Sequence, residues 1–144
     1  MTRIRPTIKK GEWVLTKHQF YTAYHYAMQY NEWKTELDAI TFVSAISPDS
    51  EPHGTGVGNP TEVKAMRRER FSTKVETIRS LAAQAAPEIS NWLLLAVTNE
   101  GVTYNYLRNR GMPCGKNYFY DRRRKFYYLL SKHLEEKDTG DNNP

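Results

Sequence analysis

The chain has 144 residues, of which 39% are hydrophobic and 26% are charged, so we expect one domain with at most a small additional arm. This composition excludes a wholly disordered chain, and no run of about 18 apolar residues is present to form a transmembrane helix. Residues 1–10 are basic and lead into Trp13 without an apolar stretch, so we expect no signal peptide. The single cysteine, Cys114, suits a reducing cytoplasm, which is where we expect the protein to act.

The formal net charge of +5 is unevenly distributed along the chain. Thr103 to Lys137 contains nine basic and three acidic residues, whereas the remainder contains 12 basic and 13 acidic residues. The excess positive charge therefore lies in the last part of the chain, where contact with a polyanion such as nucleic acid is expected. The alternative interpretation is a helix face that is merely solvated.

The first predicted element is a long helix from about Lys17 to Phe42. Thr16 and Gln19 have the spacing of a capping box, in which each side chain bonds to the other residue's backbone N–H. The helix is rich in aromatic residues, namely Phe20, Tyr21, Tyr24, Tyr26, Tyr30 and Trp33. Such a helix needs an apolar partner surface, either in this chain or on a second subunit, so a homo-oligomer through the N-terminal helix is one expectation. We assign residues 1–43 to an N-terminal arm and this helix.

A flexible linker and two further helices are predicted next. Residues 44–59 concentrate Pro, Gly and Ser without periodicity, which is typical of a linker. Asn59 and Pro60 then provide the start of a helix that should extend to about Ala86. A third helix, residues 88–98, contains the most apolar run of the chain and should be core. No segment alternates as a strand would, so the fold class is all-α, a helical bundle with residues 60–137 as its main domain and 138–144 as a disordered tail.

The end of the helical domain has the pattern of a helix-turn-helix over residues 103–136. Thr103 can cap a short helix, and Gly111 can end that helix in a left-handed conformation. Met112 to Cys114 form a tight turn, and the last helix starts at about Lys116 and extends to about Glu136. A short bracing helix, a glycine turn and a longer basic helix are the parts that place a helix in a major groove.

Rotation by about 100° per residue divides the last helix into two faces. The inner arc carries mostly apolar side chains, namely Phe119, Arg122, Phe126, Leu129, Leu130 and His133. The opposite arc carries Asn117, Tyr120, Asp121, Arg124, Tyr127 and Tyr128. Of these we expect four to face DNA bases, since their side chains can hydrogen-bond or stack on base edges: Asn117, Tyr120, Asp121 and Arg124. Five basic side chains are expected at phosphates: Arg108, Arg110, Lys116, Arg123 and Lys125.

Little in the sequence supports catalysis, a metal site or a cofactor. The four histidines lack the spacing and the cysteine partners of a zinc site, and no phosphate-binding loop or catalytic nucleophile motif is present. Cys114 lies beside Lys116 near a predicted helix N-terminus, where its pKa could be lowered as in a redox switch. A simple turn residue is the favoured interpretation. We therefore expect a protein that is not an enzyme.

The residues from Val102 to Leu134 resemble region 4 of sigma-70 factors. In its wider setting, from about Pro60 to Leu134, the chain resembles the late-gene transcriptional activators of phages and prophages of the RinA/ArpU group. The resemblance implies that Thr103 caps the bracing helix, that Gly111 is the turn and that Lys116 to Arg124 form the reading end. The chain departs from the sigma pattern at Cys114-Gly115, where a capping Ser or Thr is usual.

Our leading hypothesis is a sequence-specific DNA-binding transcriptional regulator of phage or prophage type, working as an activator with RNA polymerase. Double-stranded DNA is the expected partner, and no membrane contact is expected. Two alternatives stay open. One is a DNA-packaging factor similar to a phage small terminase, and the other is a protein-interaction adaptor whose basic helix only contacts solvent.

Overall fold

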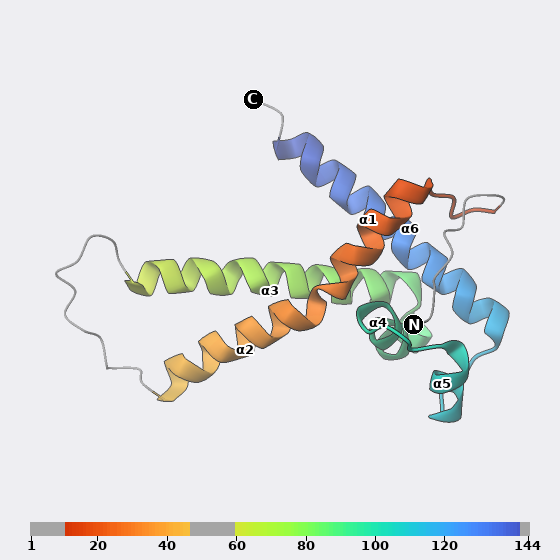
Figure 1. The fold of residues 1–144 in the computed structure, drawn as a ribbon, viewed down its shortest axis with the longest axis horizontal. Coiled ribbons are helices and arrows are strands. Elements are labelled where there is room, and N and C mark those ends of the chain that lie inside the picture. The colour runs from red at the N-terminus through yellow and green to blue at the C-terminus, as the bar shows by residue number, and fades with distance from the viewer. Residues whose placement is uncertain (1–10, 47–59, 142–144) are drawn as a thin grey trace. The chain divides into compact units, whose positions relative to one another are not determined.

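The computed structural model describes residues 11–46 and 60–141, and over these residues the protein is entirely helical (Figure 1). The helices are α1 (Lys17–Met28), α2 (Tyr30–Ile46), α3 (Pro60–Ala85), the short 3-10 helix η1 (Pro87–Ile89), α4 (Ser90–Thr98), α5 (Tyr104–Asn109) and α6 (Lys116–Asp141). The all-α prediction is confirmed. No helix of the described part is both long and apolar enough to cross a membrane.

The chain forms two compact units. Unit 1 consists of residues 1–29 and 78–144, and unit 2 consists of residues 30–77. The division falls between α1 and α2 and again within α3, so it groups α1 with the helices at the other end of the chain. The predicted domain boundaries at residues 43, 59 and 137 stay a prediction, and the predicted linker lies outside the described residues from position 47 to 59.

Unit 1 is organised around α1, which crosses α6 (Figure 1). The predicted capping box is confirmed: the Thr16 hydroxyl accepts a hydrogen bond from the Gln19 backbone N–H, and Gln19 Oε1 accepts one from the Thr16 backbone N–H. After this cap, Phe20, Ala23 and Ala27 are buried at helical spacing. The two alanines let the helix backbone approach its neighbours closely. Burial of the Phe20 ring contributes about 1.5–3 kcal/mol to the free energy of unfolding. The apolar face of α1 is therefore covered within the same chain.

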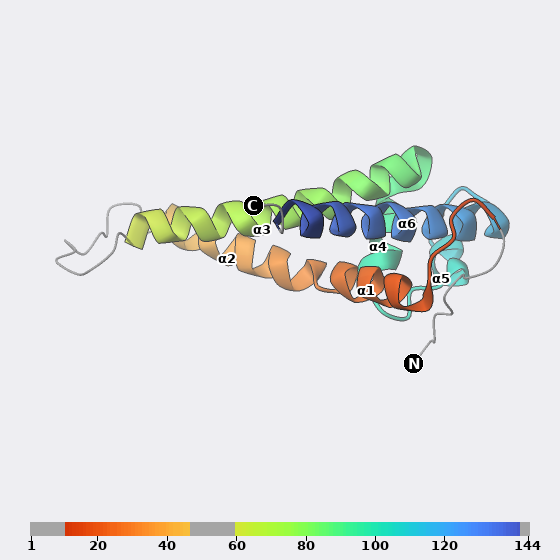
Figure 2. The same cartoon turned by 90° about the horizontal axis from the view of Figure 1, so that it is seen from above.

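The apolar run of α4 provides the middle of the unit 1 core. Leu93 and Val97 are fully buried, one turn apart on the same face of the helix. Pro87 starts η1, which leads directly into α4 and buries Ile89. In the view of Figure 2, α4 is seen between α1 and α6, in agreement with its packing against both helices. Of the residues 92–97 predicted to be core, Leu93, Ala96 and Val97 are buried, whereas Trp92 and Leu94 are half-buried and Leu95 is exposed.

The prediction of one continuous helix from Lys17 to Phe42 is wrong. The first helix ends at Met28, and a second one begins at Tyr30. At Gln29 the backbone N–H bonds to Tyr26 O, three residues back, which is the tighter bond of a terminating turn. No proline or glycine marks this interruption, so the local sequence contains no signal for it. The last helix was also predicted too short, since α6 continues to Asp141 instead of ending near Glu136.

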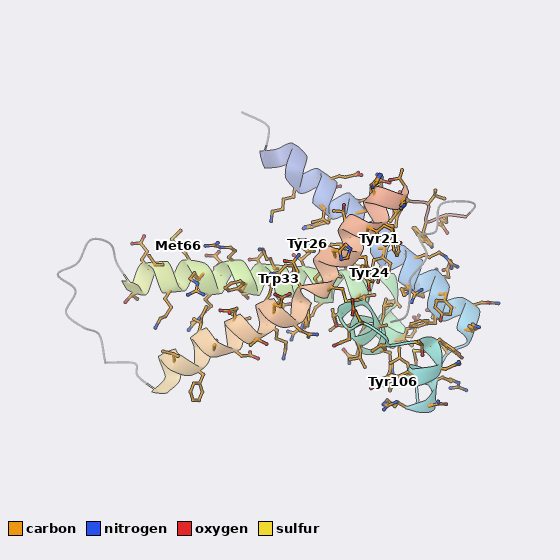
Figure 3. All side chains as sticks on the ribbon, viewed as in Figure 1. Tyr21, Tyr24, Tyr26, Trp33, Met66 and Tyr106 are labelled. Carbon is orange, nitrogen blue, oxygen red and sulfur yellow. The ribbon has the colours of Figure 1, made fainter. Side chains whose placement is uncertain are left out.

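Unit 2 is formed by α2 and the part of α3 up to Thr77. Arg67 Nη2 lies 3.4 Å from Glu36 Oε2, and Lys74 Nζ lies 5.1 Å from the centroid of the Trp33 ring. Tyr30, Trp33, Ile40 and Val75 are buried, whereas every residue from 61 to 70 is exposed. Figure 3 shows Trp33 and Met66 on this unit, and Met66 is 60% exposed.

Candidate nucleic-acid interface

The end of α5 is closed by a glycine turn that is held by backbone hydrogen bonds. The Thr103 hydroxyl caps the start of the helix by accepting from the Tyr106 backbone N–H at 3.2 Å, as predicted. At the other end, the N–H of Met112 bonds to Leu107 O and the N–H of Gly111 bonds to Arg108 O, both at 3.1 Å. This pair of bonds is a Schellman motif, and Gly111 has the positive φ of +105° that it requires.

Two side chains of α5 hold the backbone of the turn that follows. Arg108 Nη1 donates to Met112 O at 2.8 Å, and the Tyr104 hydroxyl donates to Cys114 O at 2.9 Å. Leu107 and Met112 are fully buried beneath this turn, which is the apolar contact that accompanies a Schellman motif. The starting point of α6 is therefore fixed relative to α5 by both backbone and side-chain bonds.

The first turn of α6 is exposed but is also attached to η1. Lys116 and Asn117 are exposed, and the side chain of neither has a hydrogen bond, ion pair or ring contact to any residue that the structure describes. One position later, the Tyr118 hydroxyl donates to Glu88 Oε2 at 2.6 Å. This hydrogen bond, together with a backbone bond and Arg122, lowers the pKa of Glu88, so the carboxylate stays ionised as an acceptor at neutral pH.

The four residues predicted to face bases occupy different environments. Asn117 is exposed and Arg124 is half-buried, and within the described ranges Arg124 has no partner. Tyr120 is half-buried, with its ring centroid 6.4 Å from that of Tyr104. The Asp121 carboxylate accepts from the guanidinium of the adjacent Arg122. The side-chain polar groups of Asn117, Tyr120 and Arg124 have no hydrogen bond to the described residues, and the role of all four stays a prediction.

Most of the basic residues predicted for phosphates also pack against aromatic rings. The guanidinium of Arg110 lies 3.6 Å from the centroid of Tyr106, and that of Arg123 lies 4.6 Å from the centroid of Tyr120. Arg108 holds the turn, as described above, and Lys125 lies 5.3 Å from the ring centroid of Trp13. Such cation–π contacts leave the outward hydrogens of a cation free to donate, while they fix where the cation sits. Within the described part of the chain, Arg108 and Lys116 have no such ring contact, and Arg108 instead has its hydrogen bond to Met112 O.

The buried face of α6 is rotated from the predicted one. Tyr127 was expected on the outer arc, but it is 1% exposed, and its ring centroid lies 5.0 Å from that of Phe20 on α1. Burial raises the pKa of the Tyr127 phenol, and its hydroxyl has no hydrogen-bond partner in the described part of the chain. Ser131 is buried on the same side. The prediction for Tyr127 was wrong because it took no account of α1, which packs on this side of α6.

A residue that the sequence did not single out, Trp13, lies on the outer face of α6. Its ring centroid is 5.4 Å from that of Tyr128, which was itself predicted to be on the outer arc. A tryptophan just before a capping box was the available signal, because a large aromatic side chain next to a helix start usually packs on something. Trp13 therefore covers part of α6 around Lys125 and Tyr128, whereas Lys116, Asn117 and Tyr118 at the start of the helix are exposed.

Cys114 does not have the properties of an activated thiol. Burial raises its pKa, and the nearby Arg108 opposes this shift without reversing it. The hypothesis of a lowered pKa at this position was wrong, since the desolvation of the thiol outweighs the positive charge. Among the described residues no group of three His, Cys, Asp or Glu side chains could hold a metal ion.

Comparison with known proteins adds no relative: no protein-family model, no curated protein and no solved structure matches this chain.

Proposed function

We propose that the protein is a sequence-specific, double-stranded-DNA-binding regulator of transcription, in which α5 braces α6 and the first turns of α6 enter a major groove. The single observation that carries this proposal is the open start of α6, where Lys116, Asn117 and Arg124 have no partner among the described residues. A helix start that is held in place and still presents unpaired donors is suited to a ligand rich in acceptors.

The dimensions of this surface fit the groove. Residues 116–124 span about 12 Å along the helix axis at 1.5 Å per residue. The major groove of B-DNA is about 12 Å wide and admits one α-helix. An asparagine amide can bond both edges of adenine, and an arginine guanidinium can bond two acceptors of guanine. Asn117 and Arg124 are accordingly the proposed base-reading residues, with Tyr120 and Asp121 beside them.

The basic residues around this surface supply the general affinity for DNA. Lys116, Arg110 and Arg123 are proposed to contact phosphates on either side of the groove, and Lys125 and Arg108 to add to the local positive potential. Contacts of this kind position a protein on the duplex without reading its sequence. The ring contacts of Arg110 and Arg123 reduce the entropy that would be lost on binding, because the guanidinium groups are already held in place.

The role in transcription rests on the resemblance of residues 102–134 to sigma-70 region 4 and of the wider chain to the RinA/ArpU activators. We propose a cytoplasmic activator of phage or prophage type that acts with RNA polymerase at a promoter. DNA binding is the part of this proposal that can be tested first, since activation requires it.

The test is selection of bound duplexes from a random pool, followed by measurement of Kd against salt for the selected duplex and for an unrelated one. Arg124→Ala should reduce the preference for the selected duplex by about 5- to 150-fold, because one good bidentate base contact is worth about 1–3 kcal/mol. Arg70→Ala, which removes the same charge from α3, should leave the preference unchanged. Absence of duplex binding even at low salt would overturn the proposal.

A second candidate function, a protein-interaction adaptor, is favoured by one observation in unit 2. Large apolar side chains are exposed on α2 and on the start of α3, namely Phe42, Val43, Val63 and Met66. Contiguous exposed apolar side chains commonly mark protein-binding surfaces. A homo-oligomer would use these residues rather than α1, whose apolar face is already covered. If a measurement of molecular mass in solution shows a monomer both for the wild type and for Met66→Ser, a homo-oligomer is ruled out.

A further inference from the structure

The α2 helix of unit 2 has an exposed seam in addition to the side that contacts α3. That side carries Trp33 and Glu36, whose contacts with α3 are described above. Rotation by about 100° per residue places Thr35, Ala39 and Phe42 at least about 120° away from Trp33. All three are exposed, and Phe42 is exposed to 63%. Their spacing of four and then three residues is that of a seam by which one helix packs on another.

The first half of α3 carries an exposed stripe of its own. Val63 and Met66 are 55% and 60% exposed, and every residue from 61 to 70 is exposed. Arg70 and Thr73 continue the spacing of three or four residues, so these four side chains share one face of the helix. The stripe is therefore apolar at the start of α3 and basic one turn later.

The two helices of unit 2 carry opposite charge. Residues 30–46 contain three acidic residues and one basic residue, whereas residues 60–77 contain five basic and three acidic residues. An α2 helix is therefore attracted to an α3 helix and repelled by another α2 helix. The seam of α2 needs a basic helix with an exposed apolar stripe, and α3 of a second copy is such a helix.

The direction of the two helices is set within one chain. Trp33 contacts Lys74, whereas the later Glu36 contacts the earlier Arg67, so α2 and α3 are antiparallel. A two-fold axis parallel to the helices keeps α2 of one copy antiparallel to α3 of the other. The contact between copies therefore has the same direction as the contact within each chain.

One register of this contact matches both apolar and charged residues. If Phe42 lies opposite Met66 of the second copy, the antiparallel direction places Asp38, four residues earlier, opposite Arg70, four residues later. Asp38 is exposed, with its Oδ2 only 3.9 Å from Lys34 Nζ on the same helix, and Arg70 is exposed as well. The aromatic ring then packs on the thioether, and the carboxylate faces the guanidinium.

We propose that unit 2 is a dimerisation surface whose partner is a second copy of this chain. The seam of α2 packs on the stripe of α3 of the other copy, and the two α2–α3 pairs form a four-helix bundle. The two-fold axis makes this contact twice, so each dimer buries two seams and two stripes. This proposal does not rest on DNA binding and goes beyond the proposed function by assigning a partner to unit 2.

The first test reverses the charges that face each other between copies. The dimer Kd is measured by sedimentation of the full chain at a series of concentrations, without DNA. Asp38→Arg and Arg70→Asp should each raise this Kd about 10-fold or more, because like charges then face each other across the interface. An equal mixture of the two variants should restore the dimer, since each contact again joins an acid to a base. Glu136→Arg on α6 makes the same change of charge as Asp38→Arg and should leave the Kd unchanged.

The second test examines the register by cross-linking. The register places Thr35 opposite Thr73 of the second copy, so two variants are made in the Cys114→Ser background, one with Thr35→Cys and one with Thr73→Cys. A disulfide needs Cα atoms about 4.4–6.8 Å apart. Oxidation of the mixture should give a covalent dimer on a non-reducing gel, and oxidation of either variant alone should not. A covalent dimer of the Thr35→Cys variant alone would overturn the pairing of α2 with α3.

Hydrogen exchange identifies what covers α3. Exchange in residues 61–70 should be fast in the dilute monomer and should become slower as the protein concentration increases. Slow exchange that does not depend on concentration would overturn the proposal, because another part of the same chain would then be the cover. A wild type that stays monomeric at every concentration would overturn it too, as would an equal loss of the dimer in Glu136→Arg. None of these measurements involves DNA, so the dimer and the proposed function can fail independently.

Discussion

The hydroxyl of Tyr127 illustrates how strongly one side chain depends on a distant element. The ring is enclosed between α6 and α1, and the oxygen has no partner in the described part of the chain. A buried hydroxyl without a hydrogen bond costs about 1–3 kcal/mol of desolvation. We expect Tyr127→Phe to raise the free energy of unfolding by about 1 kcal/mol, measured by urea titration.

Tyr24→Phe serves as a matched control for that measurement, because Tyr24 is only half-buried and the same atom is removed. It should change the free energy of unfolding by less than about 0.5 kcal/mol. A loss of stability in Tyr127→Phe would show that the hydroxyl has a partner, such as an enclosed water.

Cys114 provides a pH-dependent prediction at the same scale. Because burial raises its pKa, a smaller fraction of the thiol is ionised at any pH below that pKa than in an exposed cysteine. Only the thiolate is alkylated, so the native protein should react with iodoacetamide several-fold more slowly at pH 8 than the same chain in denaturant. Equal rates in the two conditions would contradict the raised pKa.

Residues whose role is local could be predicted, and residues whose role is tertiary could not. Thr16, Thr103 and Gly111 act on atoms within a few positions of themselves, and all three predictions are confirmed. The environment of Tyr127 and the position of Trp13 depend on helices that pack from elsewhere in the chain. The buried face of α6 was predicted from the rotation of its own residues about the helix axis, which takes no account of α1. For this reason the face was misplaced.

The turn between α5 and α6 is the element whose geometry matters most for the proposed interface. Gly111 has a φ of +105°, and a Cβ added there would meet no atom within 4 Å. The cost of Gly111→Ala should therefore come from the backbone alone, about 1–2 kcal/mol. We expect this loss in the free energy of unfolding, together with weaker DNA binding, because the start of α6 would shift.

Gly115→Ala is the control for the turn. A Cβ at Gly115 also meets nothing within 4 Å, and this glycine does not have a positive φ. Alanine is a poorer N-cap than glycine by roughly 0.5–1 kcal/mol, so this substitution should cost less than Gly111→Ala. If both variants lost the same stability, the positive φ of Gly111 would not be the reason.

Helix boundaries followed the same rule as single residues. The helix starts at Thr16 and Thr103 were predicted because a capping side chain bonds to backbone atoms only a few residues away. The range of α3 was predicted nearly in full from its start at Pro60. The interruption at Gln29 was missed because an ordinary helix-forming residue occupies it. It coincides with the division between the two units, so packing rather than local preference places it.

At the scale of the molecule, the two units should differ in local stability. Every side chain from 61 to 70 is exposed, whereas α1 and α6 each bury several side chains. Helices that bury few apolar side chains unfold locally at a low cost in free energy. Hydrogen exchange should thus be at least 10-fold faster for residues 61–70 than for residues 119–130, measured by mass spectrometry on the whole protein. Equal protection would indicate that a partner, such as a second copy, covers α3.

The contact between α1 and α6 has a consequence for synthesis of the protein. Gln19 Nε2 donates to Glu135 Oε1 at 2.6 Å, although 116 positions separate the two residues. A ribosome that adds about 5–20 residues per second needs about 5–20 seconds to advance from Ala27 to Tyr127. During that interval Phe20, Ala23 and Ala27 have no α6 to cover them. The newly made chain therefore assembles its proposed DNA-binding surface only after α6 has been translated, and during the delay the apolar side of α1 is open to chaperones or to other nascent chains.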